Sequence, residues 1–301
     1  MEPFLSRVAS GPPVVGDGAL GTTLMARGLR VQDCLESAVL HRPDLIEEIA
    51  AAYLDAGAEV LTTDSFGASP LKLSSYGLDG RTGEINHRAV ELLRGVAGDG
   101  AWIGGSVGPT GRILTPYGDT EPGEVAASFE RQIGALAEAG ADLIIVETMI
   151  DFAEARLAVA AAKRLAPALP VVATMTFDAT PRGFFTTMGT TIAGAAAGLA
   201  DAGSDVVGSN CGNGIETMVA IARAFATLGA RPLIVQANAG LPRLEGDAAI
   251  YPETPEFMAS HAAALIAAGA RVIGGCCGTT PEHIRALRHA VDRGATDAAR
   301  A

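Results

Sequence analysis

The sequence predicts an α/β protein folded as a single-domain (β/α)8 (TIM) barrel, and three observations support this prediction. A motif recurs in which an Ala-rich amphipathic helix ends at a Gly and a short β-branched strand follows within two residues. The chain contains eight short apolar strands, with helix-length segments between them. Its 301 residues exceed the roughly 250 that eight βα units require.

The recurring motif gives five of these strands, and apolar runs between its copies give the other three. The copies are DAGAEVLTTD from Asp55, EAGADLIIVE from Glu138, DAGSDVVGSN from Asp201, TLGARPLIVQ from Thr227 and AAGARVIGGC from Ala267. The expected strands are 14–17, 60–63, 102–106, 143–147, 171–176, 206–210, 233–238 and 272–275. Because they are apolar at nearly every position, both faces of the sheet should be buried, as in parallel sheets covered by helices. An open, doubly wound sheet is the alternative fold.

No linker rich in Pro, Ser or Gly divides the chain, so one barrel over residues 1–292 is expected, followed by a disordered tail at 293–301. Hydrophobic residues make up 49% of the chain and charged residues 19%, which is typical of a globular enzyme. The net charge of −12 and the lack of basic runs argue against nucleic acid and anionic membranes as partners. No signal peptide or long apolar segment is evident, so a soluble cytoplasmic protein is expected.

Three of the four cysteines follow the ends of expected strands. In (β/α)8 barrels the active site lies at the C-terminal ends of the strands, where Cys211, Cys276 and Cys277 should therefore meet. Three protein ligands with one open position are typical of a catalytic Zn²⁺ site. The sequence thus predicts a Zn²⁺ site made by these three thiolates, with its fourth position open to a substrate.

Two features of the cysteines qualify this hypothesis. A lone Cys211 would more often be a core residue. Adjacent strand residues point to opposite faces, so Cys276 and Cys277 can bind one ion only if the chain turns there, which the flanking glycines allow. Cys34 lies in a polar segment away from any strand end and is interpreted as a structural or surface thiol.

Acidic residues also end two of the expected strands. Asp17 and Glu147 should face the mouth of the barrel, where carboxylates act as acid and base or bind a cation such as a substrate ammonium group. A helix cap or a salt bridge is the structural alternative for each. A Schiff-base aldolase is disfavoured because neither lysine, Lys72 or Lys163, ends a strand.

Seven motifs in order along the chain resemble the homocysteine S-methyltransferase family. They are DGALGTTL from Asp17, TTDSFGAS from Thr62, SVGPTG from Ser106, ETMIDFAEA from Glu147, SNCGNG from Ser209, QANAGLP from Gln236 and GGCCGTTPEHI from Gly274. The resemblance spans nearly the whole chain and is strongest to the homocysteine-binding module of cobalamin-dependent methionine synthases. It implies a cytoplasmic zinc enzyme of methionine biosynthesis that methylates L-homocysteine.

The resemblance also assigns roles to individual residues. Cys211, Cys276 and Cys277 match the three zinc thiolates, which would also activate the substrate thiol. Asp17 and Glu147 match residues that bind the substrate ammonium group, and the stretch from Thr63 to Ser65 lies where its carboxylate is held. Asn238 matches a side chain that supplies an oxygen ligand to the metal until substrate displaces it.

The methyl donor is predicted from what the motifs lack. The betaine-using branch of the family has tyrosines where this chain has Gly67 and Thr148, so it lacks the aromatic cage that would bind a quaternary ammonium ion. Methylcobalamin, or a separate methyl-corrinoid protein, is therefore the favoured donor, and S-methylmethionine is the alternative. A non-catalytic barrel that binds zinc and thiols is the alternative from another functional class.

Overall fold

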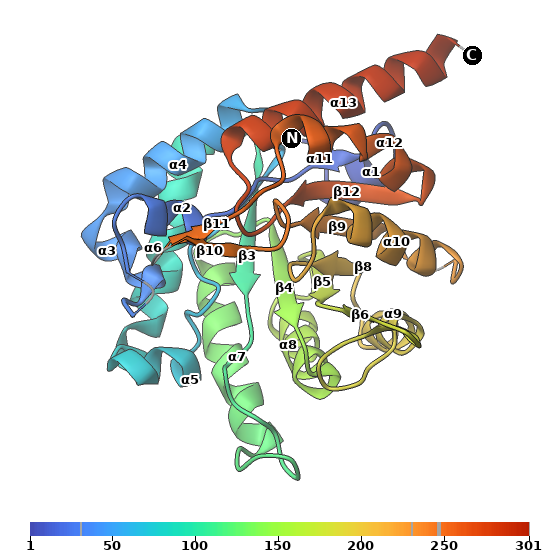
Figure 1. The fold of residues 1–301 in the computed structure, drawn as a ribbon. Helices are drawn as coiled ribbons and strands as arrows, with labels where there is room; N and C mark the ends of the chain where they lie inside the picture. The colour runs from blue at the N-terminus through green and yellow to red at the C-terminus, as the bar shows by residue number, and fades with distance from the viewer. Residues whose placement is uncertain (31, 230, 246–247, 301) are drawn as a thin grey trace.

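Eight parallel strands form the centre of the fold in a computed structural model that describes residues 1–30, 32–229, 231–245 and 248–300 (Figure 1). They are β1 (Val14–Val15), β2 (Val60–Thr62), β3 (Trp102–Val107), β4 (Leu143–Met149), β5 (Val171–Met175), β8 (Val206–Asn210), β9 (Leu233–Ala237) and β12 (Ala270–Gly275). Each strand pairs in parallel with the next in the order β1-β12-β9-β8-β5-β4-β3-β2. A parallel bridge between Gly16 and Val60 joins the two end strands. The ring confirms the (β/α)8 barrel and all eight expected strands.

The interior of the barrel is a separate apolar cluster to which every strand contributes. Its strand residues are Val14, Val60, Trp102, Leu143, Ile145, Val172, Val206, Ile234 and Val272. Helix α1 (Phe4–Ala9) adds Phe4 and Val8, and the Phe4 ring packs edge-on against Trp102 at 5.6 Å between centroids. This helix closes the N-terminal end of the barrel, so only the C-terminal end is left for a ligand.

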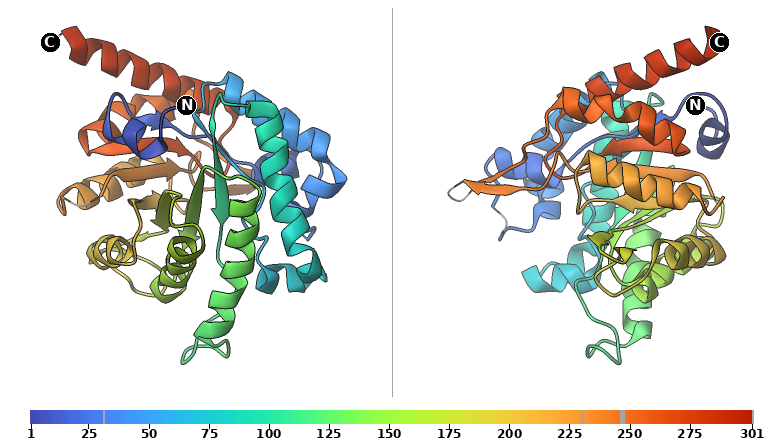
Figure 2. Two further views of the ribbon diagram at one scale, coloured as in Figure 1. Left: turned by 180° about the vertical axis from the view of Figure 1, so that it is seen from behind. Right: turned by 45° about the vertical axis from the view of Figure 1, so that its right-hand side comes forward.

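Helices surround the strands and cover their outer faces (Figures 1 and 2). The longer ones are α4 (Pro43–Asp55), α6 (Thr82–Ala97), α7 (Pro122–Glu138), α8 (Phe152–Leu165), α9 (Ile192–Asp201), α10 (Ile215–Ala226) and α13 (Pro281–Arg300). The short ones are α2 (Gly21–Ala26), α3 (Ala38–His41), α5 (Pro70–Leu73), α11 (Pro255–Ser260) and α12 (Ala262–Ala267). Their apolar faces and the outward residues of the strands form the larger core cluster. Burial on both faces explains why the strands are apolar throughout.

Two antiparallel hairpins were not expected from the sequence. They are β6 (Asp178–Thr180) with β7 (Gly183–Phe185) and β10 (Arg243–Glu245) with β11 (Ala248–Ile250), and they follow strands β5 and β9. Helix α13 runs to Arg300 and extends away from the barrel (Figure 2), so it includes residues 293–300 of the segment expected to be a tail, and Ala301 lies outside the described residues. Residues 293–300 contain Ala and Arg but no Pro, so the sequence does not stop the helix. No helix among the described residues is long and apolar enough to span a membrane.

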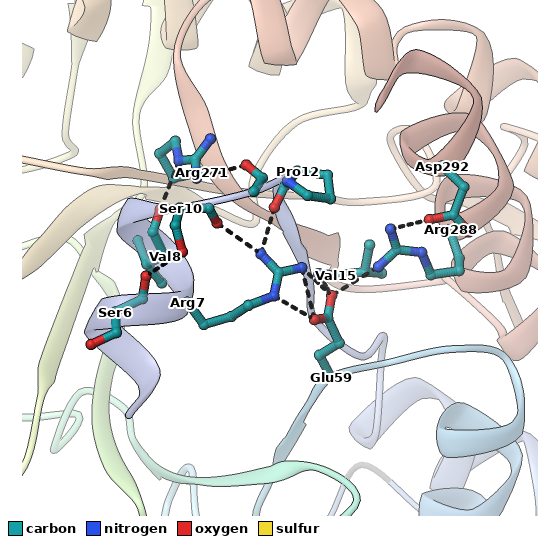
Figure 3. A network of polar contacts seen from close by, with 11 residues as sticks. Ser6, Arg7, Val8, Ser10, Pro12, Val15, Glu59, Arg271, Arg288 and Asp292 are labelled. Atoms are coloured by element: carbon teal, nitrogen blue, oxygen red, sulfur yellow. Dashed lines mark hydrogen bonds and ion pairs between the residues drawn. The ribbon is translucent and has the colours of Figure 1, made fainter. Parts of the chain in front are cut away.

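A charged network ties the chain termini to the barrel at its N-terminal end (Figure 3). The Glu59 carboxylate, just before β2, pairs with Arg7 of α1 and Arg288 of α13, each at 2.8 Å. Its Oε2 also accepts a hydrogen bond from the backbone N–H of Val15 in β1, at 3.1 Å. One carboxylate therefore links two helices to the seam where the barrel closes.

Replacing this carboxylate should weaken the fold. Glu59→Gln is expected to lower the free energy of unfolding by about 2 kcal/mol, because two partly buried guanidinium groups lose their counter-charge. Urea denaturation measures the change. The control is Glu84→Gln, which breaks an exposed pair with Arg81 and should leave the urea midpoint unchanged. Equal losses of unfolding free energy in the two variants would contradict the proposed importance of the Glu59 contacts.

Candidate active site

The C-terminal ends of the strands surround a cavity of about 220 Å³. Six of the residues predicted for the site line it: Asp17, Thr63, Glu147, Cys211, Cys276 and Cys277. Ser65 and Asn238 are buried and are not among the lining residues. The fold therefore brings together the strand-end residues that the sequence analysis selected, although they lie up to 260 positions apart along the chain.

The three cysteines form a compact sulfur cluster. The Sγ atoms of Cys211, Cys276 and Cys277 all lie within 4.8 Å of one another, and those of Cys211 and Cys277 are 3.8 Å apart. Cys211 follows β8 with a left-handed backbone (φ 61°), and its N–H donates to the Gln236 carbonyl at 3.1 Å. Such a conformation is uncommon for a non-Gly residue and is found most often at functional sites.

A turn places the two adjacent cysteines on the same side of the chain. The Cys276 N–H donates to Ala237 at 2.7 Å and the Cys277 carbonyl accepts from Ala239 at 3.0 Å, so both are held by the end of β9. Gly278 follows with φ 78°, and a Cβ there would lie 2.0 Å from the ring of Tyr251. Glycine is thus required at position 278 both by the turn and by the close approach of the ring.

Protons are unequally shared within the sulfur cluster. Hydrogen bonds from Cys211 and Cys276, with a smaller one from Tyr251, lower the pKa of Cys277. Hydrogen bonds to its two neighbours, together with burial, raise the pKa of Cys276. These shifts favour the thiolate form at Cys277 over Cys276, and metal binding would release the remaining thiol protons. Tyr251 follows the β10–β11 hairpin, and the sequence analysis missed it because no motif or strand end marks it.

Asp17 is a buried carboxyl group and Glu147 is a partly buried one, and neighbouring strands hold both. Asp17 accepts hydrogen bonds from the N–H and the hydroxyl of Thr62 at 2.6 and 2.8 Å. Glu147 accepts from the Ser106 hydroxyl at 2.5 Å and from Asn210 Nδ2 at 3.2 Å. Burial raises the pKa of each to about 7. Neither group is paired with a basic side chain in the part of the chain that the structure describes, so an entering cation would favour their ionised forms.

Asn210 joins the carboxylate and sulfur parts of the site. It is fully buried, and its Oδ1 accepts from the Thr148 N–H at 2.8 Å and from the Thr174 hydroxyl at 2.7 Å. Its Nδ2 donates to Glu147, and the next residue is Cys211. Asn210 therefore fixes the ends of β4, β5 and β8 relative to one another. The sequence analysis noted it only as the end of a strand.

The hydroxyl groups of Thr63 and Ser65 are engaged within the protein. The two oxygens are 2.6 Å apart, Thr63 Oγ1 also contacts the Gly104 carbonyl at 3.2 Å, and Ser65 Oγ donates to the Ser106 carbonyl at 2.8 Å. Both groups support the end of β2 against β3. Asp64 lies between them and lines the cavity, within the stretch that the family resemblance places beside the substrate carboxylate.

Two further residues complete the account of the predicted positions. Asn238 Oδ1 is buried and has no hydrogen-bond partner, which is unusual for a buried amide. Cys34 is buried, and its sulfur lies 3.4 Å from Glu36 Oε2. Among the described residues, the one group of metal-ligating side chains close enough to share an ion is the sulfur cluster, which excludes Cys34.

Comparison with known proteins identifies the relatives of the chain. The sequence profile of the homocysteine S-methyltransferase family matches residues 14–291. Methionine synthase of Mycobacterium tuberculosis is 33% identical over 94% of this chain, and that of Mycobacterium leprae is 33% identical over 93%. The chain spans only 25% and 24% of the lengths of these two relatives.

A solved structure resembles the chain over its whole length. The metallated form of the homocysteine methyltransferase MmuM from Escherichia coli is 28% identical and superposes with a TM-score of 0.79, covering 96% of this chain and 99% of that one. The matched family profile, the barrel and the three-cysteine rim agree, and the chain belongs to the homocysteine S-methyltransferase family.

Proposed function

We propose that the protein is a zinc-dependent S-methyltransferase that transfers a methyl group to the thiol of L-homocysteine and forms methionine. The convergence of three cysteine sulfurs on a cavity that also contains two carboxyl groups carries this proposal. Family membership and the similarity to E. coli MmuM support homocysteine as the substrate. The relatives from the two mycobacteria support a place in methionine biosynthesis.

The sulfur cluster fits a zinc ion. Zn–S bonds of about 2.3 Å in a tetrahedron imply sulfur atoms about 3.8 Å apart. The Cys211–Cys277 separation is 3.8 Å. A set of three thiolates favours zinc over harder ions. Asn238 Oδ1 has no hydrogen-bond partner, which is consistent with its serving as the fourth, oxygen ligand of the zinc ion before substrate enters. Bound zinc would supply the thiolate form of the substrate at neutral pH.

The other predicted residues would hold the amino acid. Asp17 and Glu147 would pair with the substrate ammonium group, since both line the cavity and neither has a basic partner among the described residues. The stretch from Thr63 to Ser65 would lie beside the substrate carboxylate. In the reaction the homocysteine sulfur loses its proton to solvent and gains a bond to the methyl carbon. The donor keeps the electron pair of the bond that breaks.

The positions that distinguish the betaine-using branch carry no aromatic ring here, and each is engaged with a neighbouring side chain. A Cβ at Gly67 would lie 2.5 Å from Glu36 Oε1, which accepts the Gly67 N–H at 2.7 Å. Thr148 has a left-handed backbone (φ 61°) and its hydroxyl accepts from Asn210. Methylcobalamin, free or carried by a separate corrinoid protein, is therefore our favoured donor, and S-methylmethionine is the alternative.

Zinc binding is the first test. We expect about one zinc per chain, lost in Cys211→Ala and in Cys276→Ala because two thiolates cannot hold the ion tightly. Metal analysis after dialysis gives the stoichiometry, and Cys34→Ala is the control that should keep its zinc. Full zinc retention by Cys276→Ala would reject the site. Zinc retained by the native protein without displacement of any ligand by homocysteine would instead favour a non-catalytic barrel.

Substrate recognition is tested at Glu147. Glu147→Gln should raise the KM for homocysteine about 10-fold or more, because the ammonium group loses a charged partner. Its zinc content should be unchanged. Glu154→Gln alters another buried carboxyl group, which binds Thr110 and does not line the cavity, and should leave KM unaffected. An unchanged KM in Glu147→Gln would remove this residue from the binding site.

The donor is tested directly with zinc-loaded protein and homocysteine. Methylcobalamin, S-methylmethionine and betaine are offered in parallel, and methionine is measured. We expect methylcobalamin to exceed betaine in kcat/KM, because each missing cage ring forfeits up to roughly 2 kcal/mol of cation–π attraction. If betaine is the best donor, the inference from Gly67 and Thr148 is wrong.

A further inference from the structure

The cavity contains acidic side chains but no basic ones. Asp17, Glu36, Asp64 and Glu147 line it, and none of the described lining residues is Lys, Arg or His. Homocysteine is a zwitterion, and the proposed function assigns Asp17 and Glu147 to its ammonium group. Its carboxylate then has no cationic partner and needs uncharged hydrogen-bond donors.

The hydroxyl groups nearest the expected carboxylate position cannot easily supply those donors. A hydroxyl has one proton to give. The Thr62 hydroxyl donates to Asp17. The Ser65 hydroxyl donates to the Ser106 carbonyl of β3, and the Thr63 hydroxyl donates to the Ser65 oxygen or to the Gly104 carbonyl of β3. The end of β2 therefore offers no free hydroxyl proton, although its position beside the cavity suits substrate binding.

Asp64 is the remaining polar side chain in this stretch, and it has no partner. The residue is 5% exposed. Its Oδ2 is buried without a hydrogen bond, and its Oδ1 accepts none from the described residues. The titratable groups that face it are Glu36, which is acidic, and the Cys34 thiol. A carboxyl group in such surroundings keeps its proton, and a neutral carboxylic acid is a hydrogen-bond donor.

We propose that Asp64, in its protonated form, donates a hydrogen bond to the substrate carboxylate and so selects amino-acid thiols over simple aminothiols. This inference rests on the proposed function, because it assumes that homocysteine is the ligand. Asp64 is a substrate-binding residue in this account and takes no part in methyl transfer. Burial and the neighbouring Glu36 raise the pKa of Asp64 well above its ordinary value, which agrees with the assignment.

The test compares two ligands that differ only in the carboxylate. L-Homocysteine and 3-amino-1-propanethiol are titrated calorimetrically into the zinc-loaded protein and into Asp64→Leu, Asp64→Asn and Glu147→Gln. Asp64→Leu should weaken homocysteine about 10-fold and leave the aminothiol unchanged, because it removes one hydrogen bond to a charged group. Asp64→Asn keeps an N–H donor and should bind homocysteine nearly as the native protein does. Glu147→Gln should weaken both ligands alike, since both carry the ammonium group.

The pH dependence separates a proton donor from a merely structural residue. As pH rises, Asp64 loses its proton, becomes an acceptor and repels the substrate carboxylate. We therefore divide the Kd of homocysteine for the native protein by its Kd for Asp64→Asn at each pH. This ratio should increase with pH. Titration of the zinc ligands affects both Kd values equally and cancels. A flat ratio would overturn the assignment.

Each remaining outcome has a distinct meaning. If neither thiol binds the native protein, the proposed function fails. If both bind and Asp64→Leu weakens them equally or not at all, the function stands and the role of Asp64 is refuted. If Asp64→Asn leaves thiol binding intact and instead weakens a cationic methyl donor, the carboxyl group serves the donor as an anion, which also refutes the proposal.

Discussion

The closure of the barrel between β1 and β2 is the contact on which the site depends. The bridge from Gly16 to Val60 brings the ends of these strands together, and the Asp17 carboxylate then spans the seam to Thr62. On the other side of β1, the Asp17 carbonyl accepts the Gly275 N–H at 2.9 Å, immediately before the cysteine pair. An open sheet would separate Asp17 from Thr62 and expose the cavity on one side. The closed ring therefore fixes the positions of Asp17, Glu147 and the sulfur cluster relative to one another.

The second constraint is electrostatic. Thiols and carboxyl groups crowd a cavity without basic side chains, so the protein alone cannot ionise all of them at neutral pH. Burial raises the pKa values of Asp17 and Glu147 to about 7, whereas hydrogen bonds from Cys211 and Cys276 lower the pKa of Cys277. Two cations would allow these groups to ionise: a metal ion bound by the sulfurs and an ammonium group bound by the carboxylates. The acidic lining is therefore complementary to the two positive charges that the proposed reaction brings in.

The barrel could be predicted from the sequence because it depends on local signals repeated along the chain. Gly-terminated helices followed by β-branched strands mark five of the βα units, apolar runs mark the other three strands, and all eight strands form where these patterns place them. Cys211, Cys276 and Cys277 could be selected because they end strands, and the topology alone then brings them to one rim. The roles proposed for them await experiment.

Other residues of the site could not be found in this way. Tyr251 reaches Cys277 from a loop after a hairpin whose path no strand pattern determines. The sequence includes Asp64 in a strand-end motif, but only the structure shows that its buried Oδ2 has no hydrogen-bond partner. Glu36 meets Gly67 across 31 positions of chain without a strand to relate them. These contacts depend on side-chain packing between loops.

The left-handed backbone at Cys211 limits which side chains could replace this sulfur. Among residues other than glycine, Asp, Asn and His enter that conformation most readily, whereas the other two cysteines lie on a turn that ends at Gly278. An oxygen ligand from Asp or Asn could therefore replace the sulfur at position 211 with little change of the backbone. Oxygen ligands favour harder metal ions. The position thus gives the fold a route by which a family of barrels could alter its metal preference without rebuilding the rim.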